Sequence, residues 1–395
     1  MAYLDHAATT PLLPEAAQAV AAELTRTGNP SSLHASGRRA RRVVEESRES
    51  IAEDLGVAPA DVVFTAGGTE ADNLAVKGLF WARRAADPRR TRILASAVEH
   101  HAVLDPVGWL GEHEGAEVTW LEVDRYGRVD VAALRAELDR HHDEVAFVTV
   151  MYANNEVGTI QPIPAVAAAC AEYEIPLHTD AVQAVGHLEV DGALADTLAL
   201  SGHKFGGPVG VGALVIRRGV DLVPLLHGGG QERELRSGTV DTPAVAGLAA
   251  ALRVATRDLD QNVTELGTLR DDLARRVCAS IPGAVLNGDQ WNRLPGIAHF
   301  SFPGCAGDNL LLLLDAQGVE CSTGSACTAG VPRASHVLLA MGVDEDTAKG
   351  SLRFSLGHTS TRQDVDALLA TLPAAVERAA RAGQVRAPRR AGLAV

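Results

Sequence analysis

The sequence predicts an α/β protein with a large domain built on a mostly parallel sheet of seven strands and a smaller α/β domain. Between about residues 15 and 255, short apolar runs alternate with helix-like stretches, which is the pattern of a parallel sheet covered by helices on both faces. After about Thr242, a long amphipathic segment over residues 243–279 leads into a second set of strands. We therefore expect a large domain over residues 15–255 and a small domain formed by residues 1–14 and 256–395.

The individual elements follow from runs of apolar residues and from helical periodicity. The strands expected in the large domain cover residues 62–65, 92–97, 118–123, 145–152, 176–179, 197–201 and 212–216. Helix-like stretches between them cover residues 70–84, 130–138 and 163–173 and the region after Leu104. In the small domain we expect strands at 299–302, 319–322 and 351–355 and helices at 308–317 and 362–380.

The charge balance and the lack of long apolar runs argue against several classes of function. The 395 residues carry 50 acidic and 36 basic side chains, a formal net charge of −14. This balance argues against direct binding of nucleic acid or an anionic membrane along the whole chain. The N-terminus has no secretory pattern and no apolar run has the length of a membrane span, so we expect a cytoplasmic protein with reduced cysteines.

Polar residues follow the predicted strands, at the edge where open α/β sheets bind ligands. Gly68 and Thr69 lie between the first strand and a helix, whose unpaired N-terminal N–H groups can bind an anion. An ordinary loop with a helix cap has the same local sequence. His100 follows the next strand and could stack on a flat ligand, or lie on the surface. We expect no resident metal, because the sequence has no Cys-x-x-Cys or His-Glu-x-x-His spacing.

The most informative segment is Ser201-Gly202-His203-Lys204, between an apolar strand and a glycine turn. Partial burial would lower the pKa of the Lys204 amine and free it for Schiff-base formation, although a surface lysine in a loop has the same local sequence. Asp180 also follows a strand, where it could pair with a positive ring nitrogen or cap a helix. A lysine, an aspartate and an anion site at successive strand ends are together what pyridoxal phosphate requires.

At these residues the chain resembles the class-V, fold-type-I pyridoxal-phosphate enzymes, and within them the cysteine desulfurases of the NifS/IscS type. The resemblance covers nearly the whole chain and rests on several motifs in the same order. Besides the strand-end segments above, the matching motifs are residues 3–11, 28–32, 227–232, 236–239, 325–328 and 353–357.

The resemblance implies a role for each site residue. Lys204 would bond to the cofactor, Asp180 would pair with its pyridine nitrogen, Gln183 would bind the ring hydroxyl, and His100 would stack on the ring and help to move protons. The cofactor's phosphate would be bound by Gly68, Thr69, Ser201 and His203, and by Thr239 across a homodimer interface. Asn155 and Arg353 would hold the substrate carboxylate, and Asn155 would also contact the cofactor.

Cys327 decides the expected reaction. Its neighbours are small and polar, which predicts an exposed loop suited to a nucleophilic thiolate. The resemblance implies that Cys327 takes sulfur from L-cysteine as a persulfide, leaves L-alanine, and passes the sulfur to an acceptor such as an iron–sulfur scaffold or a tRNA-thiolation enzyme. Cys327 is also a candidate transient iron–sulfur ligand shared with such a partner.

Two alternatives stay open at this point. The first is another class-V enzyme, such as a selenocysteine lyase or an aminotransferase-like protein, since these share most of the motifs. The second is a non-catalytic sulfur-relay subunit, against which the presence of Lys204, Asp180, Cys327 and Arg353 argues. The remaining cysteines (Cys170, Cys278, Cys305 and Cys321) are interpreted as core residues.

Overall fold

The computed structural model describes residues 1–324 and 334–386, so Cys327 lies outside the described residues. Within them, seven strands form one sheet in the order β2-β8-β7-β6-β5-β3-β4. The strand β8 runs antiparallel to β2 and β7, and the other neighbours are parallel, which confirms the predicted mostly parallel sheet. The strands are β2 (Val62–Thr65), β3 (Arg92–Ser96), β4 (Glu117–Leu121), β5 (Val145–Thr149), β6 (Leu177–Asp180), β7 (Thr197–Ser201) and β8 (Gly212–Ile216).

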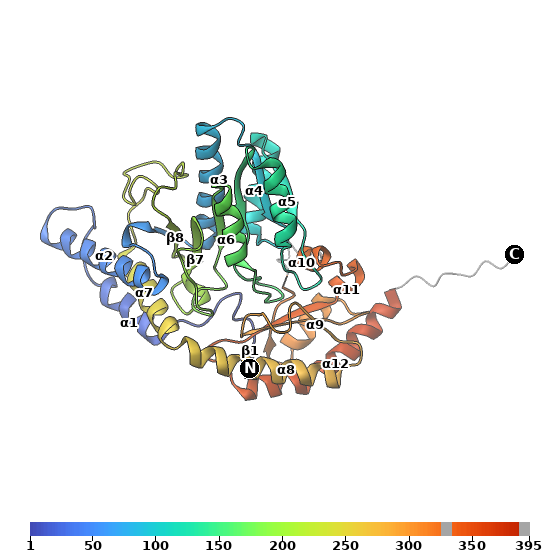
Figure 1. Ribbon diagram of the computed structural model, residues 1–395. Helices are drawn as coiled ribbons and strands as arrows, with labels where there is room; N and C mark the ends of the chain where they lie inside the picture. Colours follow the sequence, from blue (N-terminus) through green and yellow to red (C-terminus); the bar gives the residue numbers. More distant parts are fainter. Residues whose placement is uncertain (325–333, 387–395) are drawn as a thin grey trace.

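Both faces of this sheet are covered by helices (Figure 1). Because side chains alternate along a strand, Val63 packs with one layer of helices, whereas Val62 and Phe64 pack with the other. The first layer consists of α3 (Gly68–Ala86) and α4 (His101–Glu114). The second contains α2 (Ala35–Leu55), α5 (Val131–His141), α6 (Ile163–Glu172) and α7 (Thr242–Arg257).

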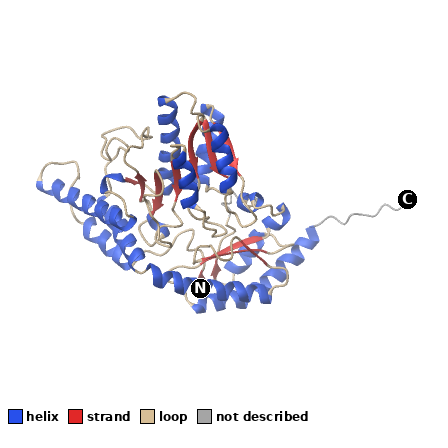
Figure 2. Cartoon of the chain, viewed as in Figure 1, coloured by secondary structure: helices blue, strands red, loops and turns tan. Residues whose placement is uncertain are grey.

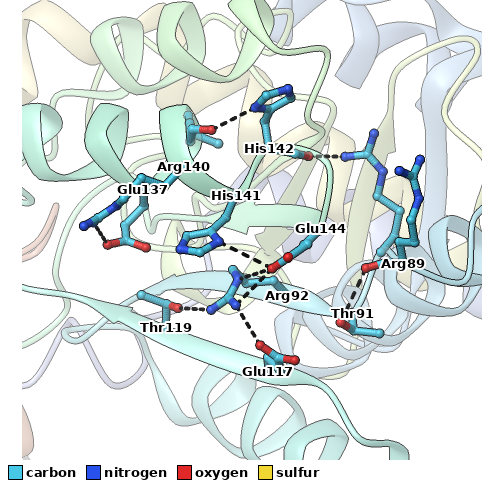
Figure 3. Close-up of polar contacts among 12 residues, drawn as sticks. Arg89, Thr91, Arg92, Glu117, Thr119, Glu137, Arg140, His141, His142 and Glu144 are labelled. Carbon is cyan, nitrogen blue, oxygen red and sulfur yellow. Dashed lines mark hydrogen bonds and ion pairs between the residues drawn. The ribbon is translucent and has the colours of Figure 1, made fainter.

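An ion-pair network joins the amino ends of three strands, at the edge of the sheet opposite to their carboxyl ends (Figure 3). The Nη2 atom of Arg92 lies 2.7 Å from Glu117 and 3.1 Å from Glu144, and His141 lies 3.4 Å from Glu144. Exposed ion pairs of this kind contribute about 0.2–1 kcal/mol each to folding stability, so the network stabilises the strand ends only weakly.

The second core lies below the first in Figures 1 and 2 and is built from shorter strands. An antiparallel sheet has the order β12-β10-β9, and β1 pairs with β11 in parallel. The helices α8 and α12 lie side by side along the lower edge of Figure 1 and pack against these strands. The elements are β1 (Ala2–Tyr3), β9 (Val285–Asn287), β10 (Ile297–Ser301), β11 (Val319–Glu320), β12 (Ser351–Ser355), α8 (Leu259–Ser280), α9 (Gly307–Asp315), α10 (His336–Ala340), α11 (Glu345–Lys349) and α12 (Arg362–Arg386).

Several elements differ from the expectation. The segment 243–279 forms two helices, α7 and α8, which meet at Asp258. The helices α1 (Pro14–Leu24) and α2, and the short strands β1 and β9, were not anticipated. Cys170, Cys305 and Cys321 are buried, but Cys278 is exposed on α8, so its interpretation as a core residue is wrong. The domain boundaries at residues 14/15 and 255/256 stay a prediction.

Candidate active site

A cavity of about 410 Å³ opens at the carboxyl ends of β6 and β7. This is the edge at which an open α/β sheet binds ligands. The predicted site residues that line it are Gly68, Thr69, His100, Asn155, Asp180, Gln183, Ser201, His203, Lys204 and Arg353. A larger cavity of about 670 Å³ lies at the opposite edge of the sheet, but none of these residues lines it, so chemistry and not size identifies the site.

Lys204 ends a short 3-10 turn, η2 (Gly202–Lys204), that follows β7. Its Nζ donates hydrogen bonds to the carbonyl oxygens of Ala7 at 2.8 Å and Ala8 at 3.1 Å. Burial, followed by the positive charge of Arg353, lowers the pKa of the Lys204 amine from 10.5 to about 8. An appreciable share of this amine is therefore neutral, and nucleophilic, near neutral pH.

Asp180 is the last residue of β6 and is buried. Its Oδ1 accepts the backbone N–H of Val182 at 2.9 Å, and among the described residues no donor is bonded to its other oxygen. Burial raises the pKa of Asp180 to about 6, while the Val182 hydrogen bond and the charge of Lys204 oppose that rise. The free oxygen can accept a hydrogen bond from a cationic ring nitrogen that enters the cavity.

An anion cradle forms where β2 leads into α3. Gly67 has φ of 138°, a conformation that favours glycine, and Gly68 is the first helical residue. A Cβ at Gly68 would lie 2.7 Å from Val182, and one at Gly67 would lie 3.8 Å from the Ser201 hydroxyl, in ordinary van der Waals contact. The unpaired N–H groups of the first helical turn, with Thr69, Ser201 and His203 around them, suit a phosphate group.

His100 is the N-cap of α4, and its Nδ1 accepts the backbone N–H of Ala102 at 3.1 Å. The proton of the neutral ring is therefore on Nε2. His100 lines the open cavity and is solvent-exposed on that side. Desolvation by the protein around the ring, followed by the positive charge of Lys204, lowers the pKa of His100 to about 4. The Nε2 atom of Gln183 donates to Ala7 at 2.8 Å, which brings the N-terminal segment against the cavity.

Arg353, in the middle of β12, connects the two cores at the cavity. Its Nη1 donates to the carbonyl oxygen of Asn155 at 2.8 Å, and its Nη2 donates to Asp5 at 2.9 Å. Its Nε is buried and has no hydrogen-bond partner among the described residues. The guanidinium of Arg353 therefore lines the cavity as a buried cation with an unused donor, which suits an incoming carboxylate.

Two predicted residues are not part of this lining. Thr239 is exposed and does not border the cavity within a single chain. Cys327 lies outside the described residues, although Ser322 and Gly324, which precede it in the sequence, do line the cavity.

The structure also brings in residues that sequence reasoning missed, among them Asp5, Ala7, Ala8 and Asp72. For Asp72 the available signal was its position four residues after Gly68, on the same face of α3.

Comparisons with known proteins agree with this geometry. The family model of aminotransferase class-V matches residues 2–368. The IscS-like cysteine desulfurase of Mycobacterium tuberculosis is 59% identical over 385 residues, which is 97% of this chain and 98% of that protein. The cysteine desulfurase IscS of Dictyoglomus turgidum is 44% identical over 379 residues, 95% of this chain and 94% of that protein. A solved NifS-like protein superposes with a TM-score of 0.87 at 34% identity, covering 96% of this chain and all of that one.

Proposed function

The chain belongs to the cysteine desulfurases of the aminotransferase class-V family, and on that premise we propose its reaction and the role of each residue in the cavity. The reaction removes sulfur from L-cysteine, yields L-alanine and leaves the sulfur as a persulfide on Cys327. The observation that carries the proposal is the convergence of a low-pKa lysine, a buried carboxylate and a helix N-terminus on one cavity.

The cofactor in this proposal is pyridoxal phosphate. The cradle at Gly67 and Gly68 fits its phosphate, the free oxygen of Asp180 fits its ring nitrogen, and Lys204 is the amine that bonds to it. When bound, this cofactor supplies an electron sink that stabilises negative charge on the substrate's α-carbon. Gln183 is assigned to the ring hydroxyl and His100 to the ring face.

Side chains of this chain bind the substrate and move its protons. Arg353 holds the substrate carboxylate through its guanidinium, with Asn155 beside it. Once the substrate amine has taken the place of Lys204 on the cofactor, the freed Nζ would be a neutral amine able to accept the α-proton, and the carbonyl oxygens of Ala7 and Ala8 would accept its hydrogen bonds. His100 exchanges protons through Nε2, since its Nδ1 is occupied by Ala102.

Sulfur transfer is assigned to Cys327. Gly324 borders the cavity, and the three residues from there to Cys327 give a chain length of about 10 Å when extended. The Cys327 thiolate attacks the substrate sulfur, so that an S–S bond forms as the C–S bond breaks. The electron pair of the C–S bond stays with carbon, which is protonated to the methyl group of alanine.

The proposal extends to assembly. We assign Thr239 to the cofactor phosphate of a second copy of the chain, because it is exposed and cannot serve the cavity of its own chain. The persulfide is passed to a sulfur-acceptor protein of iron–sulfur assembly or tRNA thiolation. A cytoplasmic location belongs to the proposal, because a reducing compartment keeps such a thiol free. Within the described residues, no helix combines the length and the apolar character needed to cross a membrane.

The test is a product assay on the purified, cofactor-loaded protein with L-cysteine and a reductant. We expect sulfide and alanine in equal amounts, loss of both with Cys327→Ser, and wild-type rates with Cys278→Ser, which removes an exposed cysteine on α8. Product formed by Cys327→Ser at the wild-type rate would contradict the assignment. A loaded protein that forms no sulfide from L-cysteine would favour a selenocysteine lyase or an aminotransferase-like enzyme.

A further inference from the structure

A cluster of buried ionisable side chains lies around Asp180. Asp72 on α3, Glu99 just before α4 and His178 on β6 have exposed fractions of 1%, 0% and 0%. His178 and Asp180 are two residues apart on β6 and therefore share one face of that strand. The helix α3, which carries Asp72, packs on β6.

Asp72 and His178 face each other without an assigned hydrogen bond. The Oδ1 atom of Asp72 lies 3.3 Å from Nε2 of His178, and neither atom has a hydrogen-bond partner among the described residues. The other ring nitrogen of His178, Nδ1, lies 3.0 Å from the Thr197 hydroxyl. An ionised Asp72 facing a His178 protonated on Nδ1 would place two buried acceptors in contact, which is unfavourable. A single proton between Oδ1 and Nε2 satisfies both atoms.

The electrostatic surroundings indicate where this proton resides. Burial, together with the charges of Asp180 and Glu99, raises the pKa of Asp72, and burial lowers the pKa of His178 to about 4. The neutral Asp72 hydroxyl then donates to Nε2, and Nδ1–H donates to Thr197. Burial and the charge of Asp180 also raise the pKa of Glu99, whose Oε1 accepts the N–H of Met151 at 2.7 Å.

We propose that Asp72 and His178 share one proton in a buried hydrogen bond, and that this proton leaves Asp180 as the ionised carboxylate of the cavity. Lys204 supports this arrangement, since its positive charge faces Asp180 and favours the ionised form. Asp72 is thus a positioning residue that acts through Asp180. The consequence for the cofactor's ring nitrogen rests on the proposed function, whereas the shared proton does not.

The direct test is infrared difference spectroscopy on the cofactor-free protein at neutral pH. Asp72→Asn should remove the carbonyl band of one protonated carboxylic acid, whereas Asp180→Asn should remove a carboxylate band. Loss of a carboxylate band with Asp72→Asn would overturn the proposal, because Asp72 would then be ionised. This experiment needs no bound cofactor, so its failure is distinct from failure of the proposed function.

Two variants of His178 provide a second measurement if Asp72→Asn does not fold. His178→Gln keeps an acceptor for the Asp72 hydroxyl and should leave the acid band close to its wild-type frequency. His178→Leu removes the acceptor and should shift that band to higher frequency. An acid band at the same frequency in wild type and both variants would contradict a shared proton.

The third measurement is the pH titration of the absorbance of the bound cofactor. Asp72→Asn replaces a neutral group by a neutral group and should leave the titration midpoint unchanged. A shift of about one pH unit or more would mean that Asp72 carries a charge near the ring and would overturn the proposal.

Discussion

The low pKa of Lys204 predicts how fast the cofactor-free protein takes up pyridoxal phosphate at each pH. A shift from 10.5 to about 8 raises the share of neutral amine at pH 7 by roughly 300-fold over an exposed lysine. Because only the neutral amine is nucleophilic, uptake should rise about fivefold from pH 7 to 8 and about twofold or less from pH 8 to 9.

Two neighbours of Lys204 allow this midpoint to be moved in opposite directions. The charge of Arg353 lowers the pKa of Lys204 and that of Asp5 raises it. Arg353→Gln should therefore move the midpoint to higher pH, and Asp5→Asn should move it to lower pH. Asp5 accepts a hydrogen bond from Arg353, the proposed ligand of the substrate carboxylate, and neither residue is assigned a contact with the cofactor.

The assay is stopped-flow absorbance of cofactor uptake with the cofactor in excess, and Lys204→Ala is the control that should show no bound chromophore. A rate that keeps rising about tenfold for each pH unit up to pH 10 would show an ordinary lysine and would refute this account of its burial. Midpoints that do not move in either variant would refute the electrostatic part of the reasoning.

Three further predictions concern packing and binding. Glu232→Gln leaves the buried Arg48 without its two-point carboxylate at 2.8 Å and should lower the free energy of unfolding by about 3–5 kcal/mol in urea titrations, whereas the exposed Glu234→Gln should change little. Gly68→Ala places a Cβ 2.7 Å from Val182 and should weaken cofactor binding about tenfold by fluorescence titration, while Gly108→Ala, which meets nothing within 4 Å, should bind normally. Arg353→Lys removes the planar fork and should raise KM for L-cysteine about tenfold or more, and an unchanged KM would place the substrate carboxylate elsewhere.

The buried strands were predictable from sequence because their signals are local. The strands β7 and β8 match the expected 197–201 and 212–216, since each is a short apolar run next to glycine or polar residues. The helix α2 was not anticipated because its composition is dominated by arginine and glutamate. Its buried residues nevertheless include Ala40, Val44, Ile51 and Leu55, which lie along one narrow stripe.

The residues of the site likewise fall into those that the sequence could predict and those that it could not. Lys204 and Asp180 could be found because each follows a strand, and open α/β sheets gather such residues at one edge. The carbonyl oxygens of Ala7 and Ala8 could not be found, because a backbone acceptor has no side-chain signature. The pairing of Asp72 with His178 depends on which strand α3 covers, and that is a property of the fold.

The proposed reaction requires that sulfur from L-cysteine passes to Cys327. The most direct measurement is a single turnover of the cofactor-loaded protein with L-cysteine and no reductant, followed by alkylation and mass spectrometry of the peptides. We expect one additional sulfur on the peptide that contains Cys327, with one alanine released for each sulfur bound. Additional sulfur on Cys278 or Cys321 instead, or alanine without any protein-bound sulfur, would contradict it.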